Sequence, residues 1–95
     1  MKFLFDKQNK VDSTKEDVDL LIDILLSVNS KEKMENLLLG LLTPKEVEEI
    51  AERIRIVQLL KKGVGQHEVA AKLNTGVATV SRGAKELKMG RFQTV

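Results

Sequence analysis

The stretch that decides the fold is residues 65–88, GQHEVAAKLNTGVATVSRGAKELK. Each of its two halves repeats apolar residues at intervals of three and four, which is the spacing of one buried helix face. These residues are Val69, Ala70 and Leu73, followed by Val77, Val80, Ala84 and Leu87. Between the halves lies Asn74-Thr75-Gly76, where asparagine tolerates and glycine readily adopts a left-handed backbone. The pattern predicts a helix-turn-helix over residues 66–88.

The second of these helices has a polar face that favours contact with DNA. Short and cationic side chains lie off its apolar stripe, and no acidic residue precedes Glu86 in it. These side chains belong to Ala78, Thr79, Ser81, Arg82 and Lys85. A helix with such a face can enter the major groove of DNA. The alternative is a helical hairpin that only helps to build an all-α protein.

Charge is divided unevenly along the chain, whose formal net charge is +2. Residues 1–60 hold nine Lys and Arg against twelve Asp and Glu, a net charge of −3. Residues 61–95 hold seven Lys and Arg against two acidic residues, a net charge of +5. The basic part coincides with the helix-turn-helix and could face phosphate groups. A solvated surface of uneven charge is the simpler alternative.

Composition argues against several classes of function. The 95 residues contain no Cys and one His, so they offer neither a disulfide framework nor a cysteine- or histidine-based metal site. A glycine-rich phosphate loop and a nucleophile elbow are also missing, and we predict no enzyme activity, no catalytic residue and no metal. Without a recognisable signal peptide or membrane span, the chain is predicted to be soluble and cytoplasmic, with no membrane partner.

The first residues have no sustained hydrophobic period. Residues 1–12 are therefore predicted to form a mobile arm, followed by a single helical domain over residues 13–95. Ser13 or Thr14 is predicted to cap a first helix that runs to about Val28.

The next segment indicates a partner chain. Ser30 is predicted to cap a second helix that ends near Leu41. Apolar residues cover too much of the circumference of both helices for one face to bury them. A chain of this length has little with which to enclose such helices, so we expect a homodimer.

A third helix has the clearest local start in the sequence. Thr43 is predicted as its N-cap, Pro44 as its first helical residue, and Glu46 as the residue that completes a capping box. The helix is predicted to end at Gly63 in a left-handed C-cap. Residues 89–95 are too few for a stable helix of their own.

Residues 41–88 resemble the tryptophan operon repressor family, on the motifs LLTP, RIRIV and VATVSRG together. The resemblance implies an all-α fold, an intertwined homodimer, and a transcriptional repressor that binds a specific double-stranded DNA operator. The family continues with a further helix where this chain has residues 89–95.

The resemblance also carries the family's DNA contacts onto six positions. They are Gln66, Val77, Ala78, Thr79, Ser81 and Lys88. The hydroxyl groups can donate to base edges or phosphate, the apolar side chains can meet thymine methyl groups, and the lysine can neutralise backbone charge. Two further family contacts fall on Ala70 and Ala71, where the family has longer polar side chains, so a different operator is expected.

A tryptophan corepressor is implied in the same way. The family's ligand residues fall on Leu42, Thr43, Arg53, Arg82 and Gly83, and Glu86 stands where the family has a serine near the ligand's ammonium group. Guanidinium groups can stack on an indole ring and bind a carboxylate. Glu86 is expected either to pair with the ammonium group or to pair with Arg82 and occupy the pocket.

Each ligand residue also has a simpler explanation. Thr43 serves as a cap, and Arg53 can pair with Glu49 along one helix. Gly83 within a helix indicates either a ligand or a backbone that passes close by. For the whole protein, the alternative is a helical dimerisation or adaptor module whose basic half binds an acidic partner.

Overall fold

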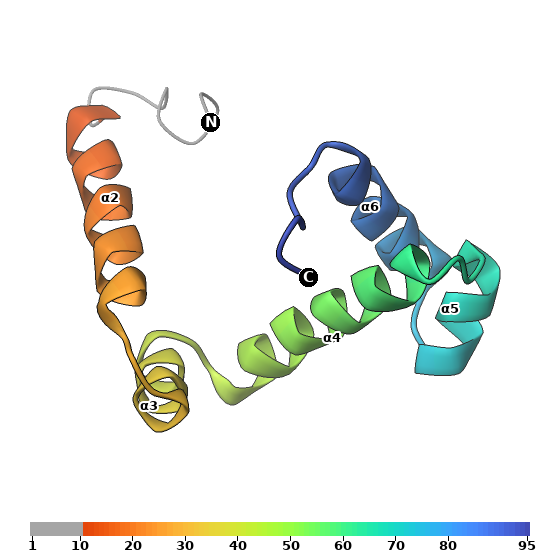
Figure 1. The fold of residues 1–95 in the computed structure, drawn as a ribbon, viewed down its shortest axis with the longest axis horizontal. Helices are drawn as coiled ribbons and strands as arrows, with labels where there is room; N and C mark the ends of the chain where they lie inside the picture. The colour runs from red at the N-terminus through yellow and green to blue at the C-terminus, as the bar shows by residue number, and fades with distance from the viewer. Residues whose placement is uncertain (1–10) are drawn as a thin grey trace. The chain divides into compact units, whose positions relative to one another are not determined.

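The computed structural model describes residues 11–95, which contain α-helices and no strand (Figure 1). This confirms the predicted all-α class. The helices are α2 (Val11–Ser27), α3 (Lys31–Leu41), α4 (Pro44–Lys61), α5 (Gln66–Leu73) and α6 (Val77–Lys88). The chain separates into two compact units, one ending at Leu41 and the other spanning Leu42–Val95.

Helix α2 begins earlier than predicted. Residues 1–10, most of the predicted arm, lie outside the described part of the chain. Val11 and Asp12 already belong to α2, so the predicted start at Ser13 or Thr14 was wrong. Neither glycine nor proline occurs near this point, and nothing in the sequence therefore stops the helix from extending by one more turn.

Helices α2 and α3 expose much of their apolar surface. The Ser30 hydroxyl accepts a hydrogen bond from the backbone N–H of Lys33 at 3.1 Å, which confirms the predicted cap of α3. Yet α3 has no buried residue. Large apolar side chains of both helices are exposed, including Leu20, Leu21, Ile22, Ile24 and Leu26 of α2, and Leu39 and Leu41 of α3. Within its own chain, this unit builds no enclosed core from the side chains that the structure describes.

Both predicted ends of α4 are confirmed. The Thr43 hydroxyl accepts from the backbone N–H of Glu46 at 3.1 Å, and the Glu46 carboxylate accepts from the backbone N–H of Thr43 at 2.8 Å. At the other end Gly63 has a φ of +88°. The backbone N–H of Gly63 donates a hydrogen bond to the carbonyl of Leu60, and that of Val64 donates to the carbonyl of Leu59. These are the two hydrogen bonds of a Schellman motif.

The helices α4, α5 and α6 pack together into a unit that we call the three-helix head (Figure 1). Its core consists of one buried cluster with residues from all three helices, namely Ile56, Val69, Ala70 and Val80. Leu59, Leu60, Val64 and Leu73 pack against this cluster. Val69, Ala70 and Val80 of the predicted apolar stripes thus belong to the core, whereas Val77 of the same pattern is exposed.

Of the two residues in the turn between α5 and α6 that can adopt a left-handed backbone, only Asn74 does so. Asn74 has a φ of 53° and ends α5. Gly76 instead has a φ of −76° in extended backbone and forms the N-cap of α6. One left-handed residue is enough to redirect the chain, because the extended N-cap then starts the next helix.

After α6 the chain forms turns rather than a further helix, as predicted for residues 89–95. Gly90 has a φ of +80° and reverses the chain direction. The Lys61 ammonium group of α4 donates to the backbone carbonyl of Phe92 at 2.7 Å. This contact ties the C-terminal segment to the three-helix head.

Candidate functional site

Helix α6 has one side inside the head and one side in solvent. Val80 is fully buried, whereas Gly83, Ala84 and Leu87 are half-buried on the same side. The exposed residues of the helix include all five DNA-contact positions assigned to it, namely Val77, Ala78, Thr79, Ser81 and Lys88. The accessible surface of α6 is thus the one that the sequence predicted for DNA.

A hydrogen bond joins the start of α5 to this surface. The Ser81 hydroxyl donates to the side-chain oxygen of Gln66 at 2.7 Å, and both residues are exposed. Two of the predicted DNA-contact residues, one from each helix of the helix-turn-helix, are therefore side by side. The sequence contained no indication of this bond, because the two residues are fifteen positions apart.

The two hydroxyl residues of α6 lie on different flanks. Residues two apart on an α-helix are separated by about 160° around its axis. Thr79 therefore lies on the flank away from Ser81. Thr79 belongs with Val77 and Ala78 to the first turn of α6, so these three can approach DNA through the end of the helix and Ser81 through its side.

One of the predicted ligand residues, Gly83, lies where α6 packs on α4. A Cβ atom built on Gly83 would lie 3.2 Å from Cγ2 of Ile56, which shows that the two helices approach each other closely at this glycine. Arg82 precedes Gly83, and Arg53 lies one helical turn before Ile56. Close packing of α6 on α4 thus explains the glycine, and the two exposed arginines flank the contact.

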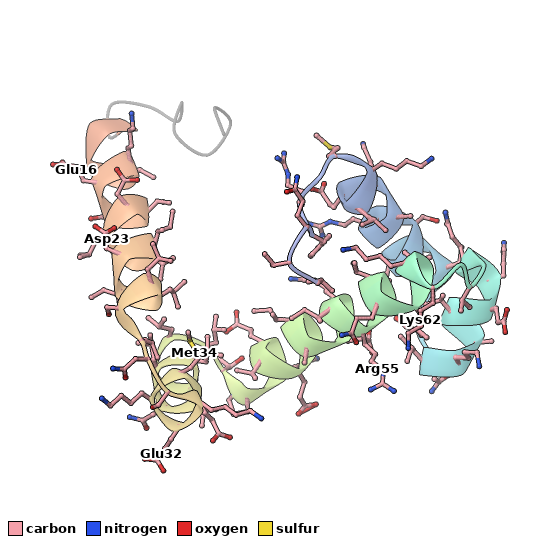
Figure 2. The ribbon with its side chains drawn as sticks, viewed as in Figure 1. Glu16, Asp23, Glu32, Met34, Arg55 and Lys62 are labelled. Carbon is pink, nitrogen blue, oxygen red and sulfur yellow. The ribbon has the colours of Figure 1, made fainter. Side chains whose placement is uncertain are left out.

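Neither arginine of α4 is engaged by a neighbouring acid. Among the described residues, no ion pair joins Arg53 to Glu49 or Arg55 to Glu52, although the sequence spacing allowed both. Figure 2 shows Arg55 as a side chain that projects from α4. The guanidinium group of Arg53 therefore remains free for another partner.

Glu86 pairs with a residue that the sequence did not single out. Its carboxylate lies 3.2 Å from Nε of Arg91, and the expected pair with Arg82 does not form. The reversal at Gly90 is the cause, since the backbone N–H of Arg91 also bonds the carbonyl of Glu86 at 3.2 Å. This Schellman turn folds Arg91 back over the last turn of α6.

Leu42 and Thr43 are not part of this arrangement. They precede α4, and Thr43 lies thirteen residues before Ile56, or about 20 Å along the helix axis. Within one chain, Thr43 therefore cannot reach a small ligand held at Gly83. Its hydroxyl oxygen accepts the capping bond, which leaves the hydroxyl proton free to donate.

Hydrogen bonds at the start of α4 lower the pKa of Glu46. The backbone N–H of Thr43, and then its side chain, hold the pKa of this carboxyl below 4.5 by hydrogen bonding to the ionised form. The cap of α4 thus depends on a negative charge.

Across the described residues, no helix combines the length and the apolar character needed to cross a membrane. Figure 2 labels Glu16 and Asp23 on α2, Glu32 on α3, and Lys62 at the end of α4. The basic residues of the helix-turn-helix lie in the three-helix head.

Comparison with known proteins identifies the family. The family described as Trp repressor protein matches residues 16–94. A Trp operon repressor homolog of Xylella fastidiosa (strain M23) is 38% identical over 71 residues, which cover 74% of this chain and 77% of the relative. A Trp operon repressor homolog of Vibrio cholerae serotype O1 is 36% identical over 69 residues, which cover 72% of this chain and 67% of the relative.

No solved structure matches this chain significantly. The family match spans all of α3 to α6 and most of α2, including the helix-turn-helix. This chain therefore belongs to the Trp repressor family, a family of DNA-binding transcriptional repressors.

Proposed function

We propose that this protein represses transcription as a homodimer that binds a specific DNA operator, with tryptophan as corepressor. The observation that carries the proposal is the helix-turn-helix, in which α6 buries Val80 and keeps its polar side exposed. The proposed DNA contacts are Gln66, Val77, Ala78, Thr79, Ser81 and Lys88. Membership of the family supports this assignment, and all six of these side chains are exposed.

Two observations support the dimer. Helices α2 and α3 expose large apolar side chains, and exposed apolar patches of this kind mark association surfaces. The proposed ligand residues are also divided within one chain, because Thr43 lies about 20 Å from the Gly83 contact. A second copy could bring its own Leu42 and Thr43 to the arginines of the first.

The proposed ligand site combines Leu42, Thr43, Arg53, Arg82, Gly83 and Glu86. The two free guanidinium groups suit an aromatic ring and a carboxylate. The carboxylate of Glu86 would accept a hydrogen bond from the ligand's ammonium group. For this it must first break its ion pair with Arg91. An amino acid should then bind better than an analogue without the amine.

The test of DNA binding is selection from a pool of randomised duplexes, followed by gel shifts of selected and unselected duplexes. We expect enrichment of one sequence with two related half-sites. Thr79→Ala should reduce the discrimination between the two kinds of duplex by about 1–3 kcal/mol. Thr94→Ala, which changes an exposed threonine of the C-terminal segment, is the matched control. Equal affinity of the wild-type protein for all duplexes would refute operator recognition and favour an adaptor function.

The test of the corepressor uses the composition of the chain, which contains neither Trp nor Tyr. Emission from added tryptophan can therefore be followed almost without protein background. We expect binding of tryptophan, weaker binding of indole-3-propionate, and a smaller difference between the two in Glu86→Gln. Unchanged tryptophan emission at millimolar protein would exclude tryptophan as ligand, whereas equal affinities would exclude the role of Glu86.

A further inference from the structure

A row of residues on α6 continues the surface that Gln66 and Ser81 begin. Ser81, Lys85 and Lys88 are spaced by four and three residues, which places all three within about 60° around the helix axis. Each of them is exposed. Because the Ser81 hydroxyl bonds Gln66, the row also reaches the start of α5. We call Gln66, Ser81, Lys85 and Lys88 the cationic stripe.

Within residues 11–95, no ion pair neutralises the positive charge of this stripe. Among the described residues, neither Lys85 nor Lys88 has an ion-pair partner. The acid of α6, Glu86, is held 3.2 Å from Arg91. Arg91 therefore compensates the carboxylate that would otherwise weaken the positive potential beside Lys85.

Other polar residues of α6 lie off the stripe. Thr79 is about 160° from Ser81 around the axis, and Arg82 is about 100° from it. Arg82 lies between the stripe and the flank on which Gly83 meets Ile56, about 100° from Ser81 and about 100° from Gly83. Lys85 is about 40° from Ser81 and about 60° from Arg82 around the axis, so it lies nearest to the proposed DNA contacts.

From this placement we infer that Lys85 binds the phosphate backbone of DNA beside Lys88, so that the cationic stripe follows one strand while the first turn of α6 enters the groove. The inference rests on the proposed DNA binding and adds a contact to it. Lys85 and Lys88 are about 4.5 Å apart along the helix axis. The flexible stems of two lysines this close together can reach neighbouring phosphates of one strand. Lysine, a compact charge on a flexible stem, suits a contact that does not read sequence.

The experiment measures binding of the full chain to a fluorescein-labelled duplex of random sequence by anisotropy at a series of KCl concentrations. Lys85→Ala and Lys88→Ala are compared with the wild type. Lys45→Ala is the matched control, because Lys45 is an exposed cation in the first turn of α4, about 16 Å along the helix axis from Ile56, where α6 packs. Thermal unfolding followed by circular dichroism verifies that each variant folds.

We expect Lys85→Ala to lower the affinity for all duplexes and to reduce the slope of log K against log salt by about 0.9 per bound chain. Lys88→Ala should do the same, the double variant should lose about 1.8 per bound chain, and Lys45→Ala should keep the wild-type slope. Lys85→Arg should restore the slope, because it restores the charge. A wild-type slope for Lys85→Ala beside a reduced slope for Lys88→Ala would overturn this inference and leave the DNA-binding proposal intact. Absence of binding by the wild type would overturn both.

Discussion

Helices α2 and α3 and the three-helix head are both rich in apolar residues, but they use them differently. The head buries Ile56, Val57, Val69 and Val80 to 1% exposure or less. In α2, by contrast, Leu26 is 78% exposed, and α3 has no buried residue. The head therefore has a buried core of its own within one chain, although Ile50, Ile54 and Val77 are exposed on it. The apolar side chains of α2 and α3, by contrast, lack a covering surface among the described residues.

The difference follows from how the apolar residues are arranged rather than from how many there are. In α5 and α6 they form narrow stripes, and each stripe faces a neighbouring helix of the same chain. In α2 and α3 they extend around the helix, so one neighbour cannot cover them. A narrow stripe favours packing within the chain, and a broad one favours association with another chain.

The largest expected effect would break this comparison. Leu26→Glu changes an exposed residue, which in a monomer should alter the free energy of unfolding by no more than about 0.5 kcal/mol. In the proposed dimer it would bury an unpaired charge and should cost more than about 3 kcal/mol. Thermal unfolding and sedimentation measure the two outcomes. Asn29→Asp, which adds one negative charge at an exposed residue outside the helices, is the control.

If Leu26→Glu unfolds and sediments like the wild-type protein, the apolar face of α2 is not an interface. A stable wild-type monomer at micromolar concentration would lead to the same conclusion. Either result would remove the dimer from the proposed function without affecting the packing of the head.

A smaller effect would sharpen the description of the head. Gly83→Ala brings a methyl group to 3.2 Å from Cγ2 of Ile56, which is 1% exposed and has little room to move. The overpacking should outweigh the gain in helix propensity and cost about 1 kcal/mol. In an Ile56→Leu background the branched methyl is absent from Cβ, and Gly83→Ala should then be neutral or stabilising. Urea unfolding of the wild type, Gly83→Ala, Ile56→Leu and the double variant gives this double-mutant cycle. Equal effects of Gly83→Ala in both backgrounds would show that the Ile56 methyl is not what requires glycine.

The smallest effect concerns the start of α4, where the two units meet in sequence. Because hydrogen bonds from Thr43 lower the folded-state pKa of Glu46, ionised Glu46 stabilises the fold above its unfolded pKa. This stabilisation is lost as the pH falls below 4.5 and through the lowered folded-state pKa. Glu46→Gln should therefore lower the midpoint of thermal unfolding at neutral pH and have less effect in acid. Glu48→Gln, for an exposed acid two positions along α4, controls for the loss of charge. A difference between Glu46→Gln and wild type that does not change with pH would contradict the charged cap.

Local features of the fold were predictable because neighbouring residues determine them. The capping box at Thr43, the left-handed Gly63 and the cap at Ser30 each involve groups a few residues apart, and all three are present. The start of α2 was misjudged because a residue that is suited to be an N-cap can also lie inside a helix. No glycine or proline stops α2 from beginning before Ser13. The turn at residues 74–76 was predictable as well, but which residue is left-handed was not, since Asn74 and Gly76 were both suited to it.

The sequence by itself determined the helices, the helix-turn-helix and, through the resemblance that the comparisons bear out, the family. These depend on local propensity and on the hydrophobic period, both of which can be counted along the chain. Only the tertiary structure decided that Ser81 bonds Gln66, that Glu86 pairs with Arg91, and that Gly83 lies against Ile56. Such contacts depend on how the helices pack and how the chain reverses, because these decide which of several suitable side chains meet. The tertiary structure also decided the separation of Thr43 from Gly83. Thr43 precedes α4, and Gly83 lies against Ile56 about 20 Å further along this helix.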